Sequence, residues 1–129
     1  LPELTALENI LLPPRNIGKE NDYLAAADVL LKRMNIENVK HKYPSQMSGG
    51  EQQRVAIARA LIMNTKYIFA DEPTGNLDSK NAGMVFDIFK ELTTNFNTSL
   101  LIVTHDPEFA SKTDRIIEMA DGEIINGGH

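Results

Sequence analysis

Two carboxylates and a histidine stand where the chain could act on a phosphate. Asp71 and Glu72 follow the apolar run Tyr67–Ala70, and His105 follows the apolar run Ser99–Val103. A carboxylate at the end of a buried strand suits Mg²⁺, and the next side chain of an extended chain points the opposite way, toward a water. We therefore predict that Asp71 binds metal, Glu72 is a general base and His105 contacts phosphate. The alternative is that all three only end their strands.

A second candidate site lies at Ser48, Gly49, Gly50 and Glu51, where a long apolar helix over 52–63 begins. Ser48 and Glu51 have the spacing of a capping box. The capping box does not explain the glycines, since each costs a helix about 1 kcal/mol relative to alanine. Bare backbone lets an anion approach the unpaired N–H groups of a helix N-terminus. We therefore predict that this turn binds a nucleotide phosphate.

Helical spacing of apolar residues predicts the elements around these sites. A capping box at Thr5 and Glu8 begins a short helix, which the pair Pro13-Pro14 should end. A second helix should follow a cap at Asn21 or Asp22. The inner face of this second helix carries Leu24, Ala27, Leu31 and Met34. A further helix starts at Asp78-Ser79, and its inner face carries Val85, Ile88, Phe89 and Leu92.

The strands are short apolar runs that alternate with these helices. Tyr67–Ala70 and Ser99–Val103 are apolar at nearly every position, which is typical of parallel strands covered on both faces. Asp106 and Pro107 begin a short helix, after which Arg115–Met119 should be a strand joined by a turn to residues 123–125. The alternation predicts an α/β fold with its sites at the carboxyl ends of the strands.

Composition limits the class of protein. The 129 residues suffice for one domain, 42% of them are hydrophobic, and no apolar run is long enough to span a membrane. Cysteine is absent, and the net charge of −5 disfavours nucleic-acid binding. His41, His105 and His129 lack the spacing of zinc ligands, and His41 should be solvated.

Taken together, the motifs resemble those of ATP-binding cassette (ABC) proteins. Met47-Ser-Gly-Gly-Glu51 is similar to the signature motif, Tyr67–Glu72 to the Walker B motif, Gly75–Asp78 to the D-loop, and Thr104-His105 to the switch histidine. The stretch 71–79 most resembles the lipoprotein-releasing, macrolide-export and cell-division branch. Met47 and Glu51 replace the commoner Leu and Gln, which leaves the Ser-Gly-Gly core intact.

This resemblance implies a function and a set of roles. Asp71 would hold Mg²⁺ through water, Glu72 would be the general base, and His105 would contact the γ-phosphate of ATP. Ser48 to Glu51 would bind the γ-phosphate held by a second ATPase subunit, and Asp78 would lie at the contact between the subunits. The implied protein couples ATP hydrolysis to export or extraction, with a transmembrane permease as partner. It would be cytoplasmic and peripheral on the inner face of the cell membrane.

The resemblance also implies that a part of the family's domain is missing. No G-x-x-x-x-G-K-[ST] motif occurs, so the Walker A portion is absent. We expect the C-terminal part of a P-loop NTPase-like parallel sheet over residues 47–129, part of a helical subdomain over 1–46, and no activity of this chain alone. A fragment of a soluble, non-transport ABC ATPase and a non-enzymatic interaction module are the alternatives.

The absent Walker A strand predicts unpaired strand edges. In the family's sheet the strand resembling Leu100–Val103 lies between the Walker B and Walker A strands. Two outcomes are open: the Arg115–Met119 strand closes onto Leu100–Val103, or two copies exchange elements. We expect the dimer, because Leu100–Val103 is apolar on both faces.

Overall fold

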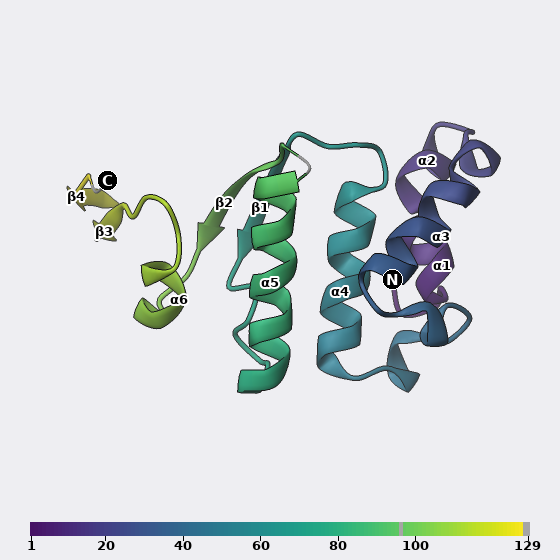
Figure 1. Cartoon of the computed structure of the whole chain (residues 1–129), viewed down its shortest axis with the longest axis horizontal. Helices are drawn as coiled ribbons and strands as arrows, with labels where there is room; N and C mark the ends of the chain where they lie inside the picture. Colours follow the sequence, from purple (N-terminus) through teal and green to yellow (C-terminus); the bar gives the residue numbers. More distant parts are fainter. Residues whose placement is uncertain (96, 128–129) are drawn as a thin grey trace.

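The computed structural model describes residues 1–95 and 97–127 of the chain. Helices and parallel strands alternate, which confirms the predicted α/β class (Figure 1). The helices are α1 (Ala6–Ile10), α2 (Leu12–Asn16), α3 (Leu24–Arg33), α4 (Gly49–Leu61), α5 (Ser79–Asn95) and α6 (Pro107–Ser111), with short 3₁₀ segments at Glu20–Tyr23, Glu37–Val39 and Pro44–Gln46. The strands are β1 (Tyr67–Asp71), β2 (Ser99–Val103), β3 (Glu118–Ala120) and β4 (Glu123–Asn126).

Local capping interactions begin three helices as the sequence predicts. The capping box at the start of α1 is formed by Thr5, whose hydroxyl accepts from the Glu8 amide at 3.2 Å. Ser48 and Glu51 form the same arrangement at α4. The Asp106 carboxylate accepts from the Glu108 amide at 3.0 Å at the start of α6. Each of these bonds satisfies an amide that the helix itself leaves free.

Two predicted helix boundaries are wrong. The pair Pro13-Pro14 does not end the first helical segment but lies in the first turn of α2, where proline loses no helical hydrogen bond. Neither Asn21 nor Asp22 caps α3, because both lie in the 3₁₀ segment that runs into it, and the N-cap residue Tyr23 makes no side-chain cap. The chain therefore enters both helices from an already helical turn.

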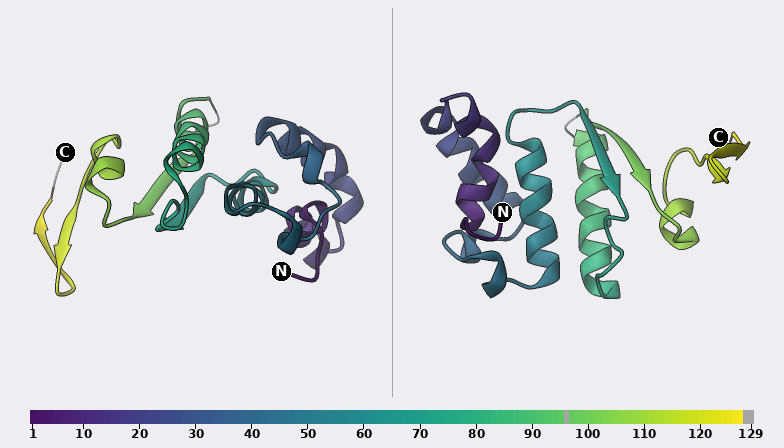
Figure 2. Two further views of the ribbon diagram at one scale, coloured as in Figure 1. Left: turned by 90° about the horizontal axis from the view of Figure 1, so that it is seen from below. Right: turned by 180° about the vertical axis from the view of Figure 1, so that it is seen from behind.

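The strands β1 and β2 form a parallel pair connected through α5. Their register runs from Tyr67 opposite Ser99 to Asp71 opposite Val103. α5 lies beside one face of the sheet (Figure 2). Its Val85, Phe89 and Leu92 are buried, and Ile68 is the buried residue of β1. This pairing places the residues that follow both strands at one edge of the sheet.

The opposite face of this sheet is open, which corrects the prediction that both strands are covered on two faces. Tyr67, Phe69, Leu101 and Val103 point away from α5, and Phe69 is 76% exposed. The chain exposes 8423 Å² in total, whereas a folded monomer of 14.4 kDa exposes about 6,800 Å². The excess belongs in part to this apolar face, because no described element packs on it.

The last two strands form a separate antiparallel hairpin. The strand predicted over Arg115–Met119 is instead β3, at Glu118–Ala120, and the predicted turn at Asp121-Gly122 connects it to β4. β3 pairs with β4 and not with β2, so the first of the two open outcomes, closure of this strand onto Leu100–Val103, does not occur among the described residues. The exchange of elements between two copies, which we expected instead, stays a prediction. The hairpin extends away from the rest of the molecule (Figures 1 and 2).

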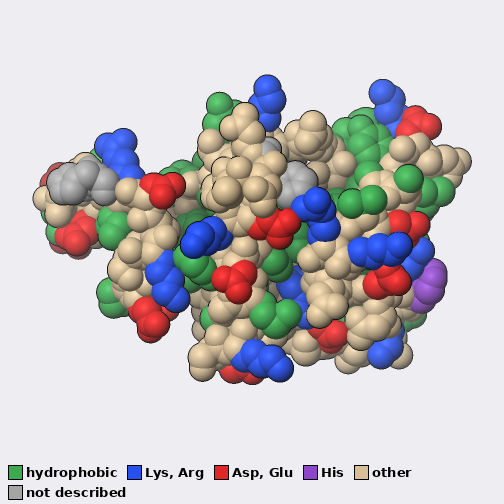
Figure 3. Space-filling model, in the orientation of Figure 1, with side chains coloured by type: hydrophobic (Ala, Val, Ile, Leu, Met, Phe, Trp, Pro, Cys, Tyr) green, Lys and Arg blue, Asp and Glu red, His purple; other side chains and the backbone are tan. Residues whose placement is uncertain are grey.

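One hydrophobic core joins the N-terminal helices to the sheet. α1 and α3 pack on one side of α4, and α5 packs on the other (Figure 1). Met34 is buried in this core as predicted, and His41 is exposed as predicted. Acidic and basic side chains are interspersed over the face shown in Figure 3. The division into residues 1–46 and 47–129 stays a prediction.

Candidate functional site

The carboxyl ends of β1 and β2 bring together the residues predicted to do chemistry. Asp71 ends β1, and Thr104 and His105 follow β2. We predicted that Glu72 continues the extended strand, but it turns away with a φ of 49°. Its amide donates to the Val103 carbonyl at 2.7 Å. The direction of the Glu72 side chain is therefore set by this left-handed turn and not by strand alternation.

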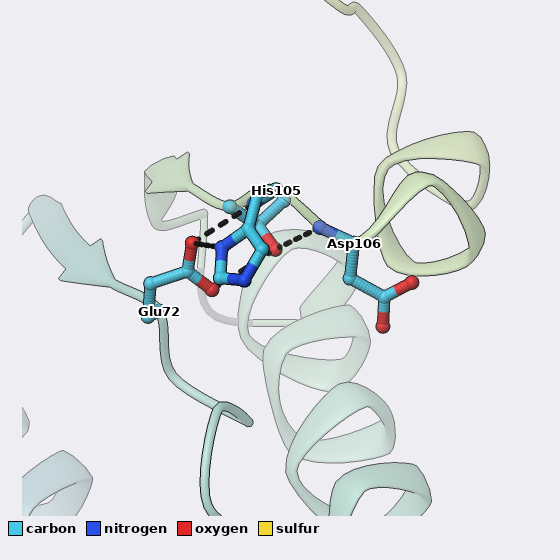
Figure 4. A network of polar contacts seen from close by, with 4 residues as sticks. Glu72, His105 and Asp106 are labelled. Atoms are coloured by element: carbon cyan, nitrogen blue, oxygen red, sulfur yellow. Dashed lines mark hydrogen bonds and ion pairs between the residues drawn. The ribbon is translucent and has the colours of Figure 1, made fainter.

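The turn directs the Glu72 carboxylate onto the residues after β2 (Figure 4). Its Oε1 accepts from the His105 amide at 2.9 Å and also pairs with the His105 ring through Nδ1. Its Oε2 has only a long contact, 3.4 Å, with the Thr104 hydroxyl. That hydroxyl also accepts from the Asp106 amide at 3.0 Å. The loop after β2 is thus organised around one carboxylate.

The charges of this pair influence each other. The hydrogen bond from the His105 ring has the largest effect on the pKa of Glu72 and lowers it; burial opposes this effect, and the hydrogen bond from the His105 amide adds to the lowering. The hydrogen bond and the charge of Glu72 in turn raise the pKa of His105. Both effects favour the ionised carboxylate beside a protonated ring. The His105 side chain is 88% exposed, so the pair lies at the surface where a substrate can reach it.

The Asp71 side chain is exposed and makes no hydrogen bond or ion pair with the described residues. Glu72 is directed to His105, so Asp71 is the free carboxylate at this edge. Within residues 1–95 and 97–127 no group of three or more His, Cys, Asp or Glu side chains is gathered for a metal ion. A single carboxylate fits Mg²⁺, which takes one or two protein carboxylates and completes its shell with water and phosphate oxygens.

The Ser48 turn begins α4 with both bonds of the capping box in place. The Glu51 amide donates to the Ser48 hydroxyl at 3.1 Å, and the Ser48 amide donates to Glu51 Oε1 at 2.9 Å. Ser48 and Gly49 are exposed. The amides of Gly49 and Gly50 are among those that a helix leaves without an internal partner. Gly49 is open to an anion, whereas Gly50 is buried.

Gly50 has a packing role that the sequence analysis missed. A Cβ at this position would lie 2.6 Å from Asn81 Cγ and closer still to Asn81 Oδ1. Gly49 is different, because its added Cβ would meet only Leu77 Cδ2 at an ordinary 3.5 Å. From the sequence we explained both glycines by the approach of an anion, but Gly50 also makes room for Asn81 of α5.

The start of α4 and the carboxyl end of β1 lie at the same end of the molecule (Figure 1). The loop after β1 reaches the Ser48 turn, as the neighbourhood of Leu77 and Gly49 shows. The chain reverses direction between α4 and β1, which brings the two segments to this end. The strand-end site and the Ser48 turn therefore lie at the same end of the molecule.

Asp78 begins α5, and Asn81 is a site residue that sequence reasoning missed. Asp78 Oδ1 accepts from the Asn81 amide at 2.8 Å and from Asn81 Nδ2 at 3.0 Å, and the backbone bond makes the larger contribution to lowering the pKa of Asp78. The spacing Asp-x-x-Asn at a helix start could have indicated this pair. The buried Arg54 of α4 lies on the other side of Asn81, at 3.5 Å.

A family model described as ABC transporter matches residues 1–75. The chain belongs to the ABC transporter family. The ABC resemblance that the motifs predicted is thereby confirmed. The part of the chain after residue 75, which contains Asp78 and His105, is covered by the matches to ABC relatives and solved ABC structures, which extend over 98% of the chain.

The ABC relatives include proteins named "Lipoprotein-releasing system ATP-binding protein LolD". The protein of that name from Leptospira interrogans is 48% identical, over 98% of this chain and 53% of its own length. The one from Treponema pallidum is also 48% identical, over 97% of this chain and 56% of its own length. The chain therefore spans about half the length of the curated relatives it matches.

Solved ABC structures share the fold. A dimeric post-hydrolysis state of the ATP-binding cassette MJ0796, bound to ADP and Pi, superposes with a TM-score of 0.81 at 38% identity, over 98% of this chain and 56% of that one. The cassette MJ1267 gives a TM-score of 0.86 at 27% identity, over 98% of this chain and 55% of that one.

Two further predictions about this ABC chain concern its ends and its helices. Of the three histidines considered for zinc, His129 lies outside the described residues. Among the helices of residues 1–95 and 97–127, none has the length and apolar character needed to cross a membrane.

Proposed function

We propose that the chain is part of the ATP-hydrolysing subunit of an ABC transporter of the lipoprotein-releasing, macrolide-export and cell-division branch. The observation that carries this proposal is the Glu72 carboxylate, held ionised by His105 beside the free carboxylate of Asp71. The names of the LolD relatives and the ADP and Pi in the MJ0796 structure support it. ATP is then the substrate, and extraction of lipid-linked proteins from a membrane is the process it would drive.

Each residue at the strand ends has a distinct part in this proposal. Asp71 would hold Mg²⁺ through water, and the ion would neutralise charge on the phosphates of ATP. Glu72 takes the proton of a water whose oxygen bonds to the γ-phosphorus as the bond to the β-phosphate oxygen breaks. Oε2 is the better oxygen for this step, because Oε1 is engaged by His105. The His105 ring, which is exposed, would contact a γ-phosphate oxygen.

The Ser48 turn has the second part. Ser48, Gly49, Gly50 and Glu51 would bind the γ-phosphate of ATP held by a second subunit, with Asp78 at the contact between the two. The free amides at the start of α4 support this assignment, since they and the helix dipole attract anions. A transmembrane permease is the further partner, and the subunit would work at the cytoplasmic face of the membrane. The dimeric MJ0796 cassette supports the pairing of subunits.

The variant Glu72→Gln tests the proposal in a completed chain, meaning these 129 residues joined to the part of the Leptospira relative that they do not cover. Loss of a general base should lower ATP turnover at least about 100-fold while ATP binding is retained. Glu123→Gln in the exposed hairpin is the matched control and should leave turnover unchanged. Turnover of Glu72→Gln within tenfold of the native sequence would refute the role of Glu72.

A further inference from the structure

Arg54 is a buried charge without a charged partner. Its residue is 5% exposed, and none of its nitrogens lies within ion-pair distance of a described carboxylate. Its Nε has no hydrogen-bond partner, and its NH1 contacts only Asn81 Oδ1 at 3.5 Å and Met84 Sδ at 3.7 Å. A buried guanidinium is costly unless a neighbour compensates it. The Asn81 carbonyl oxygen is therefore the main compensation that the described residues provide.

The Asn81 side chain has one orientation that satisfies both of its neighbours. The Asp78 carboxylate can only accept hydrogen bonds, so the amide nitrogen of Asn81 must face it. The Arg54 guanidinium can only donate, so the carbonyl oxygen must face that way. The observed contacts, 3.0 Å to Asp78 and 3.5 Å to Arg54, have this arrangement. One amide thus connects a carboxylate at the start of α5 to a cation in α4.

The same side chain fits against the bare backbone of Gly50. Gly50 and Arg54 are four residues apart and share one face of α4, and Asn81 and Met84 are three apart and share one face of α5. A side chain at position 50 would occupy the space of the Asn81 amide. Asn81 therefore touches the turn that begins α4 as well as the loop that ends in Asp78.

We infer that Asn81 is a positioning residue that holds the Ser48–Gly50 turn and the Gly75–Asp78 loop in one fixed arrangement. The inference rests on the proposed function for its consequence, because both segments are proposed to face the second subunit. If the two segments are fixed together, a displacement of either one moves the other. The ATP-binding turn and the subunit contact then shift as a unit.

Amide hydrogen exchange of the 129-residue chain without nucleotide tests the coupling. Asn81→Ala should accelerate exchange of the Glu51 and Gln52 amides about tenfold, although both lie in the other helix. Asn95→Ala is the matched control, since Asn95 is an exposed residue at the far end of α5. Acceleration confined to α5 in the Asn81 variant would overturn the inference.

A substitution in α4 tests whether the coupling also acts in the opposite direction, from α4 to α5. Arg54→Met removes the charge in α4 and should accelerate exchange of the Ala82 amide, which bonds to the Asp78 carbonyl at 2.8 Å in α5. An unchanged Ala82 amide would also overturn the inference.

Turnover in the completed chain separates a positioning role from a purely structural one. Asn81→Ala should lower kcat about tenfold while the KM for ATP stays within about twofold, because each subunit's own nucleotide contacts are intact. Unchanged kcat would contradict the positioning role. Absence of any Glu72-dependent turnover in the native sequence would refute the proposed function instead, and the exchange experiment would still decide the coupling.

Discussion

Alanine substitutions at two helical glycines should change the stability of the chain in opposite directions. Gly50 lies in the first turn of α4, where an added Cβ would overlap the Asn81 amide. Gly83 lies in α5, where an added Cβ would meet nothing within 4 Å. The two variants therefore make the same chemical change in a filled and in an open environment.

The magnitudes follow from two opposing contributions. Replacing a helical glycine by alanine gains about 0.5–1 kcal/mol, because the unfolded backbone loses freedom. Gly83→Ala should show this gain alone. Gly50→Ala should also displace Asn81 and weaken its bonds to Asp78 and Arg54, a cost of about 2–3 kcal/mol. The net expectation for Gly50→Ala is a loss of about 1–2.5 kcal/mol in the free energy of unfolding.

Urea unfolding followed by far-ultraviolet circular dichroism measures both changes. Equal slopes with denaturant would show that the unfolded states are comparable. The double variant Gly50→Ala, Asn81→Ala serves as the control, since shortening Asn81 removes the overlapping atoms and should reduce the cost of the Cβ at position 50. A Gly50→Ala chain as stable as the native one, or a cost that persists in the double variant, would refute the steric explanation.

Two further predictions concern the Glu72–His105 pair and the open sheet face. The raised pKa of His105 and the lowered pKa of Glu72 mean that the pair stabilises the fold most between about pH 4.5 and 6.5, losing effect as pH rises through the pKa of His105 or falls through that of Glu72. In an NMR titration, Glu72→Gln should return the pKa of His105 toward its ordinary value, and an unchanged pKa would contradict the pairing. The chain should self-associate through the open face, so Phe69→Thr with Leu101→Thr should lower the mass measured by light scattering. Val29→Thr, at an apolar residue of α3 that is as exposed as Leu101, should leave the mass unchanged, and equal effects of the two changes would refute the role of this face.

Local patterns were sufficient to predict most elements and part of the site. The capping boxes at Thr5 and Ser48 depend on residues three apart, so sequence spacing alone identifies them. Asp71 and His105 were expected at one edge because parallel strands end together, and the register of β1 and β2 confirms this. The roles assigned to these residues stay predictions.

The failures arose where a contact depends on residues far apart in the chain. The spacing around Gly50 could not indicate Asn81, 31 positions later, as the neighbour that excludes a side chain. The exposure of Phe69 could not be inferred either, since an apolar strand has the same sequence whether or not something covers its second face. At Glu72 the reason is different and local: Pro73 follows it and marks a turn, but the residue before a proline is expected to be extended and not left-handed.

The backbone at Glu72 has a consequence for which residues suit this position. A φ of 49° disfavours glutamate and would suit glycine or asparagine better. The backbone conformation and the carboxylate therefore favour different residues at this position. Glycine or asparagine would relieve the backbone but would remove the hydrogen bonds between the carboxylate and the residues after β2. The presence of glutamate at such a turn is thus better explained by its carboxylate than by its backbone preference.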